Sequence, residues 1–164
     1  MMKLKILRGV NLVAMDRNWT SDDSSDPYCE VYVNKMRIGR TPVQYQTLDP
    51  VWGGPMSTYE FEGNENDTMI TIKIFDYDAL KADDPMGQVS FRASDVLDKT
   101  AKGYPNTWLP VKPTNECECS GKLEVRVMRA TGSTSKVSRP ALRQSAVVAL
   151  SSGPKLEKHN TTDL

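Results

Sequence analysis

The sequence is short of the residues on which most enzyme active sites depend. Its 164 residues include one histidine, His159, close to the end of the chain. The commonest general base and most nucleophile–base pairs are therefore missing. No glycine-rich phosphate loop is present, since Gly53 and Gly54 are followed by proline and lack the lysine and hydroxyl of such loops. These absences favour a binding protein over an enzyme.

Cysteine, long apolar runs and net charge are also scarce. The three cysteines are an odd number and indicate reduced thiols in a cytoplasmic protein. The longest aliphatic stretch is AVVAL at 146–150, and the opening MMKLKILRGVNL lacks the apolar core of a signal peptide. Twenty-one basic residues balance 21 acidic ones, which argues against a nucleic-acid partner.

The strong periodicity of the sequence is two, as in half-buried β-strands. Apolar residues alternate with polar ones and are separated by clusters of Gly, Pro, Asn and Asp. This pattern predicts an all-β fold, an antiparallel sandwich of about eight strands. A short helix is expected over 94–99, with Ser94 as its N-cap. The expected strands cover 2–6, 29–33, 37–46, 57–61, 70–74, 88–91, 108–111 and 123–127.

The composition changes near the end of the chain. From Thr131 onward Ser, Thr, Gly, Pro and Lys dominate. Six basic and two acidic residues lie from Arg129 onward, so residues 1–128 hold 15 basic against 19 acidic residues. We therefore predict a domain over 1–129 and a basic, largely disordered and flexible tail over 130–164. The apolar segment at 141–150 could dock or bind a protein partner.

Four aspartates gather in the segment IFDYDALKADDPMG, residues 74–87. Asp76 and Asp78 project to the same side at the end of a strand, and the loop lets Asp84 return toward them. Carboxylates this close repel one another, and a calcium ion, which takes six to eight oxygen ligands, would compensate. The EF-hand is excluded, since Lys81 and Gly87 occupy its turn-glycine and closing-glutamate positions.

A second acidic loop strengthens this interpretation. It follows the first strand and has Asp16 and Asp26 at its two ends. In a sandwich this loop and the 76–84 loop can share one edge and form a cup. The alternative is that both loops are solvated acidic surface.

Several segments together resemble one known family. They are GVNLVAMD, SDPYCEVYV, TLDPVWGG, IKIFDYDALKADDPMGQV and WLPV, and their order and spacing are similar to those of the C2 domain. That domain is the calcium-dependent, phospholipid-binding sandwich of protein kinases C, synaptotagmins and phospholipases. The resemblance covers roughly residues 1–129 and implies the type II strand order, with a C2-like Greek key.

The resemblance also implies a set of ligands. The first acidic loop is four residues longer than is usual in the family, so Asp22 or Asp23 could replace or supplement a ligand, and Asp83 is expected beside the site. The family's five calcium-binding aspartates fall on Asp16, Asp26, Asp76, Asp78 and Asp84, with backbone carbonyls near Arg17 and Ala82 completing the sites.

The implied function is calcium-dependent binding to anionic phospholipid membranes. Five carboxylates account for the negative charge of residues 1–128, and about two calcium ions would nearly neutralise them. Trp19 and Leu80 are large apolar residues in polar loops and are expected to enter the membrane, although Trp19 could instead fold back onto the sandwich. A possible headgroup patch comprises Lys35, Arg37 and Arg40, which could equally be a solvated strand face.

Two other functions are weighed against this one. The first is a calcium-independent protein-interaction scaffold of the same fold, acting through its tail or a sheet face. The second is a metal-dependent hydrolase, which lacks an evident base and nucleophile. Trp52 and Trp108 match core positions of the family and are expected to be buried. The prediction is thus a non-enzymatic cytoplasmic protein, recruited reversibly to membranes.

Overall fold

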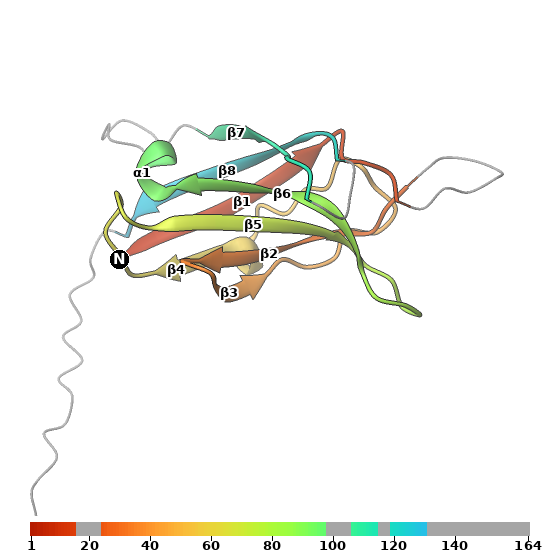
Figure 1. Ribbon diagram of the computed structural model, residues 1–164, viewed down its shortest axis with the longest axis horizontal. Coiled ribbons are helices and arrows are strands. Elements are labelled where there is room, and N and C mark those ends of the chain that lie inside the picture. The colour runs from red at the N-terminus through yellow and green to blue at the C-terminus, as the bar shows by residue number, and fades with distance from the viewer. Residues whose placement is uncertain (16–23, 98–105, 115–118, 131–164) are drawn as a thin grey trace, which may run out of the picture. The chain divides into compact units, whose positions relative to one another are not determined.

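The computed structural model describes residues 1–15, 24–97, 106–114 and 119–130. In this part of the chain two four-stranded antiparallel sheets form a sandwich (Figure 1). The prediction of an all-β, eight-stranded sandwich is confirmed. The strands are β1 (Met2–Val10), β2 (Pro27–Val33), β3 (Met36–Arg40), β4 (Thr58–Phe61), β5 (Met69–Asp76), β6 (Asp84–Arg92), β7 (Thr107–Pro110) and β8 (Lys122–Arg129).

The strand order places the loops of interest at one end of the sandwich. One sheet, the β1–β8 sheet, has the order β4-β1-β8-β7, and the other, the β2–β5 sheet, has the order β3-β2-β5-β6. The first and last strands are antiparallel neighbours, and the N–H of Ala130 donates to the carbonyl of Met1. The chain therefore enters and leaves the domain at one end, and the loops after β1 and β5 lie at the opposite end (Figure 1).

Alternating apolar residues of both sheets fill the space between them. Leu4 and Ile6 of β1, Val31 of β2, Ile72 of β5 and Val125 of β8 are all completely buried. Side chains of successive strand residues point to opposite faces, so the polar residues between them face outward. The core thus follows directly from the period of two in the sequence.

Two expected elements differ from those observed. The strand predicted over 37–46 ends at Arg40, because Pro42 has no N–H to continue the ladder. The helix expected over 94–99 is a single turn, α1 (Ala93–Val96), and a one-turn 3₁₀ helix, η1 (Pro55–Ser57), precedes β4. The N-cap of α1 is Arg92 and not Ser94, which lies inside the helix.

The expectation that both tryptophans are buried holds for only one of them. Trp52 is 8% exposed and its indole N–H donates to the carbonyl of Pro42 at 2.9 Å. Trp108 is 38% exposed on β7, which is an edge strand. The next residue, Leu109, packs against the core. Because successive strand residues face opposite sides, an error of one residue in the expected alternation exchanges the two.

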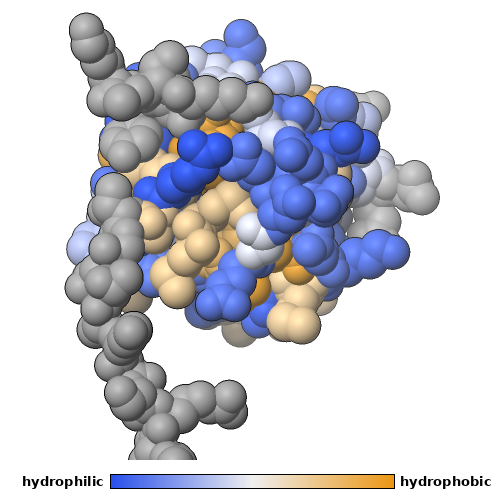
Figure 2. Space-filling model, turned by 90° about the vertical axis from the view of Figure 1, so that its left-hand side faces the viewer, coloured by the Kyte–Doolittle hydropathy of each residue, from blue (hydrophilic) through white to orange (hydrophobic). Residues whose placement is uncertain are grey.

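Apolar surface is exposed at the end of the domain where the chain begins. Figure 2 shows this end, with apolar side chains gathered among hydrophilic ones. Met1 precedes β1, Met36 begins β3 and Met69 begins β5, and all three are exposed on this side. Among the described residues no helix is long and apolar enough to cross a membrane. Residues Met1–Gly132 form one compact unit, and the boundary placed at 129 remains a prediction.

Candidate cation-binding loops

The β2–β5 sheet brings three of the predicted aspartates to one edge. Asp76 is the last residue of β5 and pairs with Pro27 of β2 on one side and with Asp84 of β6 on the other. Asp26 immediately precedes β2. The strand order that buries the apolar rows therefore also places Asp26, Asp76 and Asp84 side by side.

Hydrogen bonds hold the carboxylates of Asp26 and Asp76 in place. The N–H of Asp26 donates to Oδ1 of Asp76, and the N–H of Tyr77 donates to the carbonyl of Asp26 at 3.0 Å. The carboxylate of Asp26 in turn accepts the N–H of Gln46 at 2.7 Å. Asp76 is only 4% exposed. The start of β2 and the end of β5 are thus bound together through polar groups at the loop edge.

A tyrosine on β2 holds the β5–β6 loop. The hydroxyl of Tyr28 donates to Oδ2 of Asp83 at 2.7 Å, and the N–H of Asp78 donates to Oδ1 of the same carboxylate at 2.9 Å. Burial raises the pKa of Tyr28, and the hydrogen bond to Asp83 adds to this. Tyr28 also stacks on Phe75, with 5.6 Å between ring centroids. Both oxygens of Asp83 are therefore occupied in bracing the loop.

A lysine lies between the two outer aspartates. Nζ of Lys81 is 2.8 Å from Oδ2 of Asp84 and 3.4 Å from Oδ2 of Asp78. Oδ1 of Asp78 accepts the N–H groups of Leu80 and Lys81 at 2.9 and 3.3 Å. The hydrogen bond from the N–H of Leu80 lowers the pKa of Asp78 below its usual value, and the side chain of Lys81 lowers it further. Hydrogen bonds to Asp84 and Asp78 raise the pKa of Lys81.

The ammonium of Lys81 occupies the position of a cation between these carboxylates. In this conformation no three Asp, Glu, His or Cys side chains of the described residues converge as a metal cluster. Instead Asp78 and Asp84 share one positive charge supplied by the chain itself. The pair of carboxylates is thus arranged around a cation, which an oxygen-binding metal ion could replace.

The rest of the predicted site is divided between exposed and undescribed residues. Leu80 is 97% exposed in the β5–β6 loop, and Ala82 is also exposed. The described ends of the first loop meet at Ser25, whose hydroxyl donates to the carbonyl of Val13 and accepts the N–H of Met15. The remaining predicted residues, Asp16, Arg17, Trp19, Asp22 and Asp23, lie outside the described residues.

Two of the three cations in the predicted headgroup patch contact other side chains of the domain. Arg37 forms an ion pair with Glu30 at 2.8 Å, and the guanidinium of Arg40 lies 5.3 Å from the ring centroid of Tyr28. Lys35 is exposed in the turn between β2 and β3. Arg37 and Arg40 therefore face different partners. Their role in lipid binding stays a prediction.

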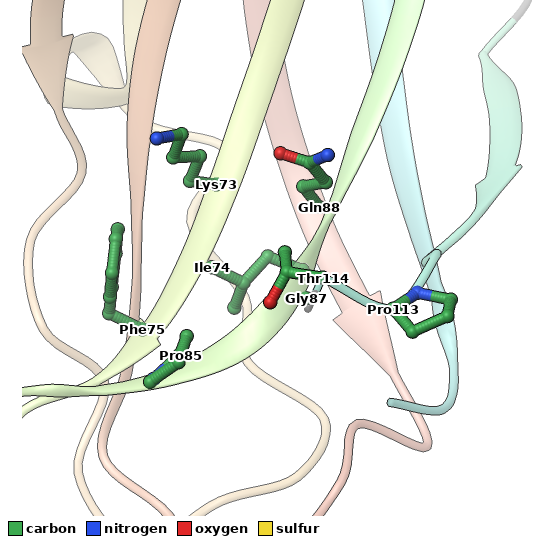
Figure 3. A pocket seen from close by; sticks show the side chains of 8 residues that line it. All are labelled: Lys73, Ile74, Phe75, Pro85, Gly87, Gln88, Pro113 and Thr114. Atoms are coloured by element: carbon green, nitrogen blue, oxygen red, sulfur yellow. The ribbon is translucent and has the colours of Figure 1, made fainter. Parts of the chain in front are cut away.

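A cavity of about 390 Å³ lies on β5 and β6, next to the aspartates (Figure 3). Phe75 and Pro85, which are paired across the two strands, form the side nearest the loop edge. Lys73 and Gln88, also paired, lie further along the strands. The ammonium of Lys73 is 5.0 Å from the ring centroid of Tyr32. This cavity is adjacent to the acidic loops but separate from them.

Three contacts of the candidate site were not predicted from the sequence. The hydroxyl of Tyr28 and the N–H of Gln46 both bind aspartates of the site, and Lys81 bridges two of them. The first two contacts join residues far apart in the chain, so no local pattern indicates them. Lys81 could have been found, because it lies three residues from both Asp78 and Asp84.

Comparison with known proteins identifies the class to which this geometry belongs. Residues 1–111 match the family described as the C2 domain. The chain therefore belongs to the C2 domain family, as its sequence motifs predicted.

Two curated relatives illustrate the similarity. The chain is 32% identical over 127 residues to a probable serine/threonine-protein kinase of Dictyostelium discoideum, an alignment that covers 76% of this chain and 12% of the kinase. It is 30% identical over 112 residues to Protein C2-DOMAIN ABA-RELATED 1 of Arabidopsis thaliana, covering 65% of this chain and 61% of that protein. The chain thus spans less than two thirds of the length of these relatives.

Solved structures share the fold. A single C2 domain of plant Extended Synaptotagmin 1 superimposes with a TM-score of 0.60 at 18% identity, covering 77% of this chain and 91% of that domain. The calcium-bound tandem C2 domains of Extended-Synaptotagmin 2 give a TM-score of 0.57 at 21% identity, covering 77% of this chain and 44% of that protein. These likenesses confirm the sandwich as that of a C2 domain.

Proposed function

We propose that this C2 domain binds anionic phospholipid membranes in a calcium-dependent manner through its loop edge. The observation that carries the proposal is the ammonium of Lys81 between Asp78 and Asp84, beside the exposed Leu80. A cation is already stabilised at this edge, and an apolar side chain projects next to it. The calcium-bound C2 domains of Extended-Synaptotagmin 2 share the fold and support the same interpretation.

The residues present fit a hard divalent ion. Their side-chain oxygens are carboxylates, the ligands that calcium prefers, and the loop contributes exposed backbone carbonyls. Magnesium fits less well because it demands strict octahedral geometry and loses its water reluctantly. The residues that would hold calcium are Asp26, Asp76, Asp78, Asp84 and Asp16, with Asp22, Asp23 and the carbonyls of Arg17 and Ala82 as further candidates.

Bound calcium would neutralise the carboxylates and offer open coordination positions to lipid phosphate oxygens. Lys81 then has a second role. If a divalent ion took the charge of the two carboxylates, its ammonium would be released from them and would be available to a lipid phosphate at the same edge. The loop edge therefore changes from one that repels an anionic surface to one that attracts it.

Leu80 supplies the apolar part of the contact. Burying a leucine side chain contributes about 1.5–3 kcal/mol, which is too little for stable attachment by itself. Electrostatic contacts must add to it, so attachment should be reversible. Trp19 is proposed as a second inserting residue. We accordingly propose a cytoplasmic binding module that is neither an enzyme nor a nucleic-acid binder, with the tail as a candidate binding segment for a protein partner.

The contribution of Leu80 separates membrane contact from calcium binding. Leu80→Ser should leave the calcium affinity unchanged in calorimetry, and it should weaken calcium-dependent cosedimentation with phosphatidylserine liposomes about tenfold. Met36→Ser is a matched control, because Met36 is also an exposed apolar residue but lies at the opposite end of the domain. Equal pelleting of the two variants would contradict the proposed orientation on the membrane.

A further inference from the structure

The outer face of the β1–β8 sheet has more cations than acids. Two of its cations are paired: Lys3 with Glu60 at 2.6 Å and Arg8 with Glu124 at 2.7 Å. Among the described residues, the other cations of this face form no ion pair. We use the name basic face for Lys3, Lys5, Arg8, Lys122 and Arg126, which lie on the outer side of β1 and β8.

Two of these cations lie directly opposite each other. Lys5 of β1 pairs in register with Arg126 of β8. Like charges in this arrangement destabilise a sheet. Arg126 donates to the side-chain carbonyl of Asn106, which carries no charge, and among the described residues neither Lys5 nor Lys122 has an acidic partner. An acidic ligand would remove this repulsion.

An exposed tryptophan belongs to the same face. Trp108, Glu124 and Arg8 form one row across β7, β8 and β1. The guanidinium of Arg8 lies 5.1 Å from the centroid of the Trp108 ring. Glu124 is buried and accepts hydrogen bonds from Arg8 and, at 2.7 Å, from Asn106. Arg8 is therefore fixed against the indole before any ligand arrives.

A shallow cavity of about 480 Å³ adjoins this row. Arg8, Val10, Asn11, Trp108 and Lys122 line it. Tryptophan and arginine are among the residues most enriched where binding energy concentrates at protein interfaces, especially where a partner side chain fills a pocket. A cavity of this volume has room for one apolar side chain.

We propose that the basic face binds an extended acidic segment of a partner protein. Carboxylates of the segment contact Lys5, Lys122 and Arg126, and one apolar side chain enters the cavity beside Trp108. Lys122 and Arg126 are four residues apart on β8, roughly 13 Å, which an extended peptide spans readily.

The placement of the face favours a protein over a membrane as its ligand. The face extends along the outer side of β1 and β8, from Lys3 at the end where the chain begins to Lys122 near the loop end, whereas the acidic loops project from that end (Figure 1). A membrane touched by the loop edge does not lie against this side. The proposed interaction therefore needs no calcium and leaves the loop edge free.

The test uses a fluorescein-labelled peptide of alternating glutamate and serine with one central leucine. Its anisotropy is measured with the full chain in chelator. We expect binding at low salt that weakens as salt rises, and a blue shift in tryptophan emission from the covered Trp108. The same binding is expected for Asp76→Asn with Asp78→Asn, which separates this proposal from the proposed function.

Two variants with the same change of charge test where the peptide binds. Lys5→Glu should weaken peptide binding about tenfold, and it should raise the melting temperature because Glu faces Arg126. Lys73→Glu, on β5 of the other sheet, should leave peptide binding unchanged. Trp108→Ala should also weaken binding.

Three results would overturn the proposal. They are no peptide binding, equal losses of peptide binding for Lys5→Glu and Lys73→Glu, and Lys5-dependent binding of phosphatidylserine vesicles in chelator in place of the peptide. The last result would make the face a lipid contact.

Discussion

Lys81 is the residue at which calcium binding can be perturbed most informatively. Its ammonium lies 2.8 Å from Asp84 and 3.4 Å from Asp78, on a side chain that is 59% exposed. Calcium binding must break both ion pairs, and the bound ion is then repelled by the nearby ammonium of Lys81. We therefore predict that Lys81→Gln strengthens calcium binding, whereas loss of a polar residue from a binding loop would ordinarily weaken it.

The size of the effect follows from the exposure of the lysine. Each solvated ion pair contributes little, and repulsion between a unit charge and a divalent ion about 6 Å away in water is worth roughly one factor of ten. Together these give an increase in calcium affinity of about three- to tenfold, measured by isothermal titration calorimetry. Lys81→Arg keeps the charge and should remain within about twofold of the unmodified chain.

The same substitution has the opposite effect without calcium. Removing the ammonium leaves Asp78 and Asp84 to repel each other, so the melting temperature in chelator should fall slightly. The rise on adding calcium should then be larger than for the unmodified chain. Unchanged or weaker calcium affinity in Lys81→Gln would show that the lysine does not compete for the site.

Three further substitutions test the contacts that hold the loops in place. Gly87→Ala should destabilise the domain by about 1–3 kcal/mol in urea unfolding, because φ is +114° and a Cβ would lie 2.6 Å from Val111; wild-type stability would show that the segment moves aside. Tyr28→Phe should cost about 0.5–1.5 kcal/mol in thermal unfolding by removing the bond to Asp83, and no loss would mean that water replaces it. The pKa of Asp78 is lowered in the folded state by the hydrogen bond from the N–H of Leu80. Its ionised carboxylate therefore stabilises the fold above the unfolded pKa, and this stabilisation is lost as pH falls below about 4. The melting temperature should therefore fall less steeply in acid for Asp78→Asn, and identical slopes would contradict that assignment.

The fold was predictable because its core rows are regular. Ile70, Ile72 and Ile74 alternate with polar residues and are all completely buried in β5. Edges were harder to predict. Trp108 lies on a four-residue edge strand, where the alternation is too short to show which side faces the core.

The candidate site was predictable to the extent that it depends on strand geometry. Asp76 and Asp84 meet because β5 and β6 are paired, and Asp26 joins them because β2 is the other neighbour of β5. The contact of Tyr28 with Asp83 joins residues far apart in the chain, so it is set by the folded geometry and leaves no local signal in the sequence. The contacts of Lys81 are local, and its spacing of three residues from Asp78 and from Asp84 could have indicated them.

The central claim is that calcium, held by the loop aspartates, attaches this domain to anionic membranes. Its most direct test is cosedimentation with phosphatidylserine liposomes while free calcium is set by a chelator buffer. The chain should pellet as calcium rises and remain in the supernatant without it, and Asp76→Asn with Asp78→Asn should remain there throughout while keeping a β-rich far-UV spectrum. Equal pelleting with and without calcium, or normal pelleting of the folded double variant, would contradict the account.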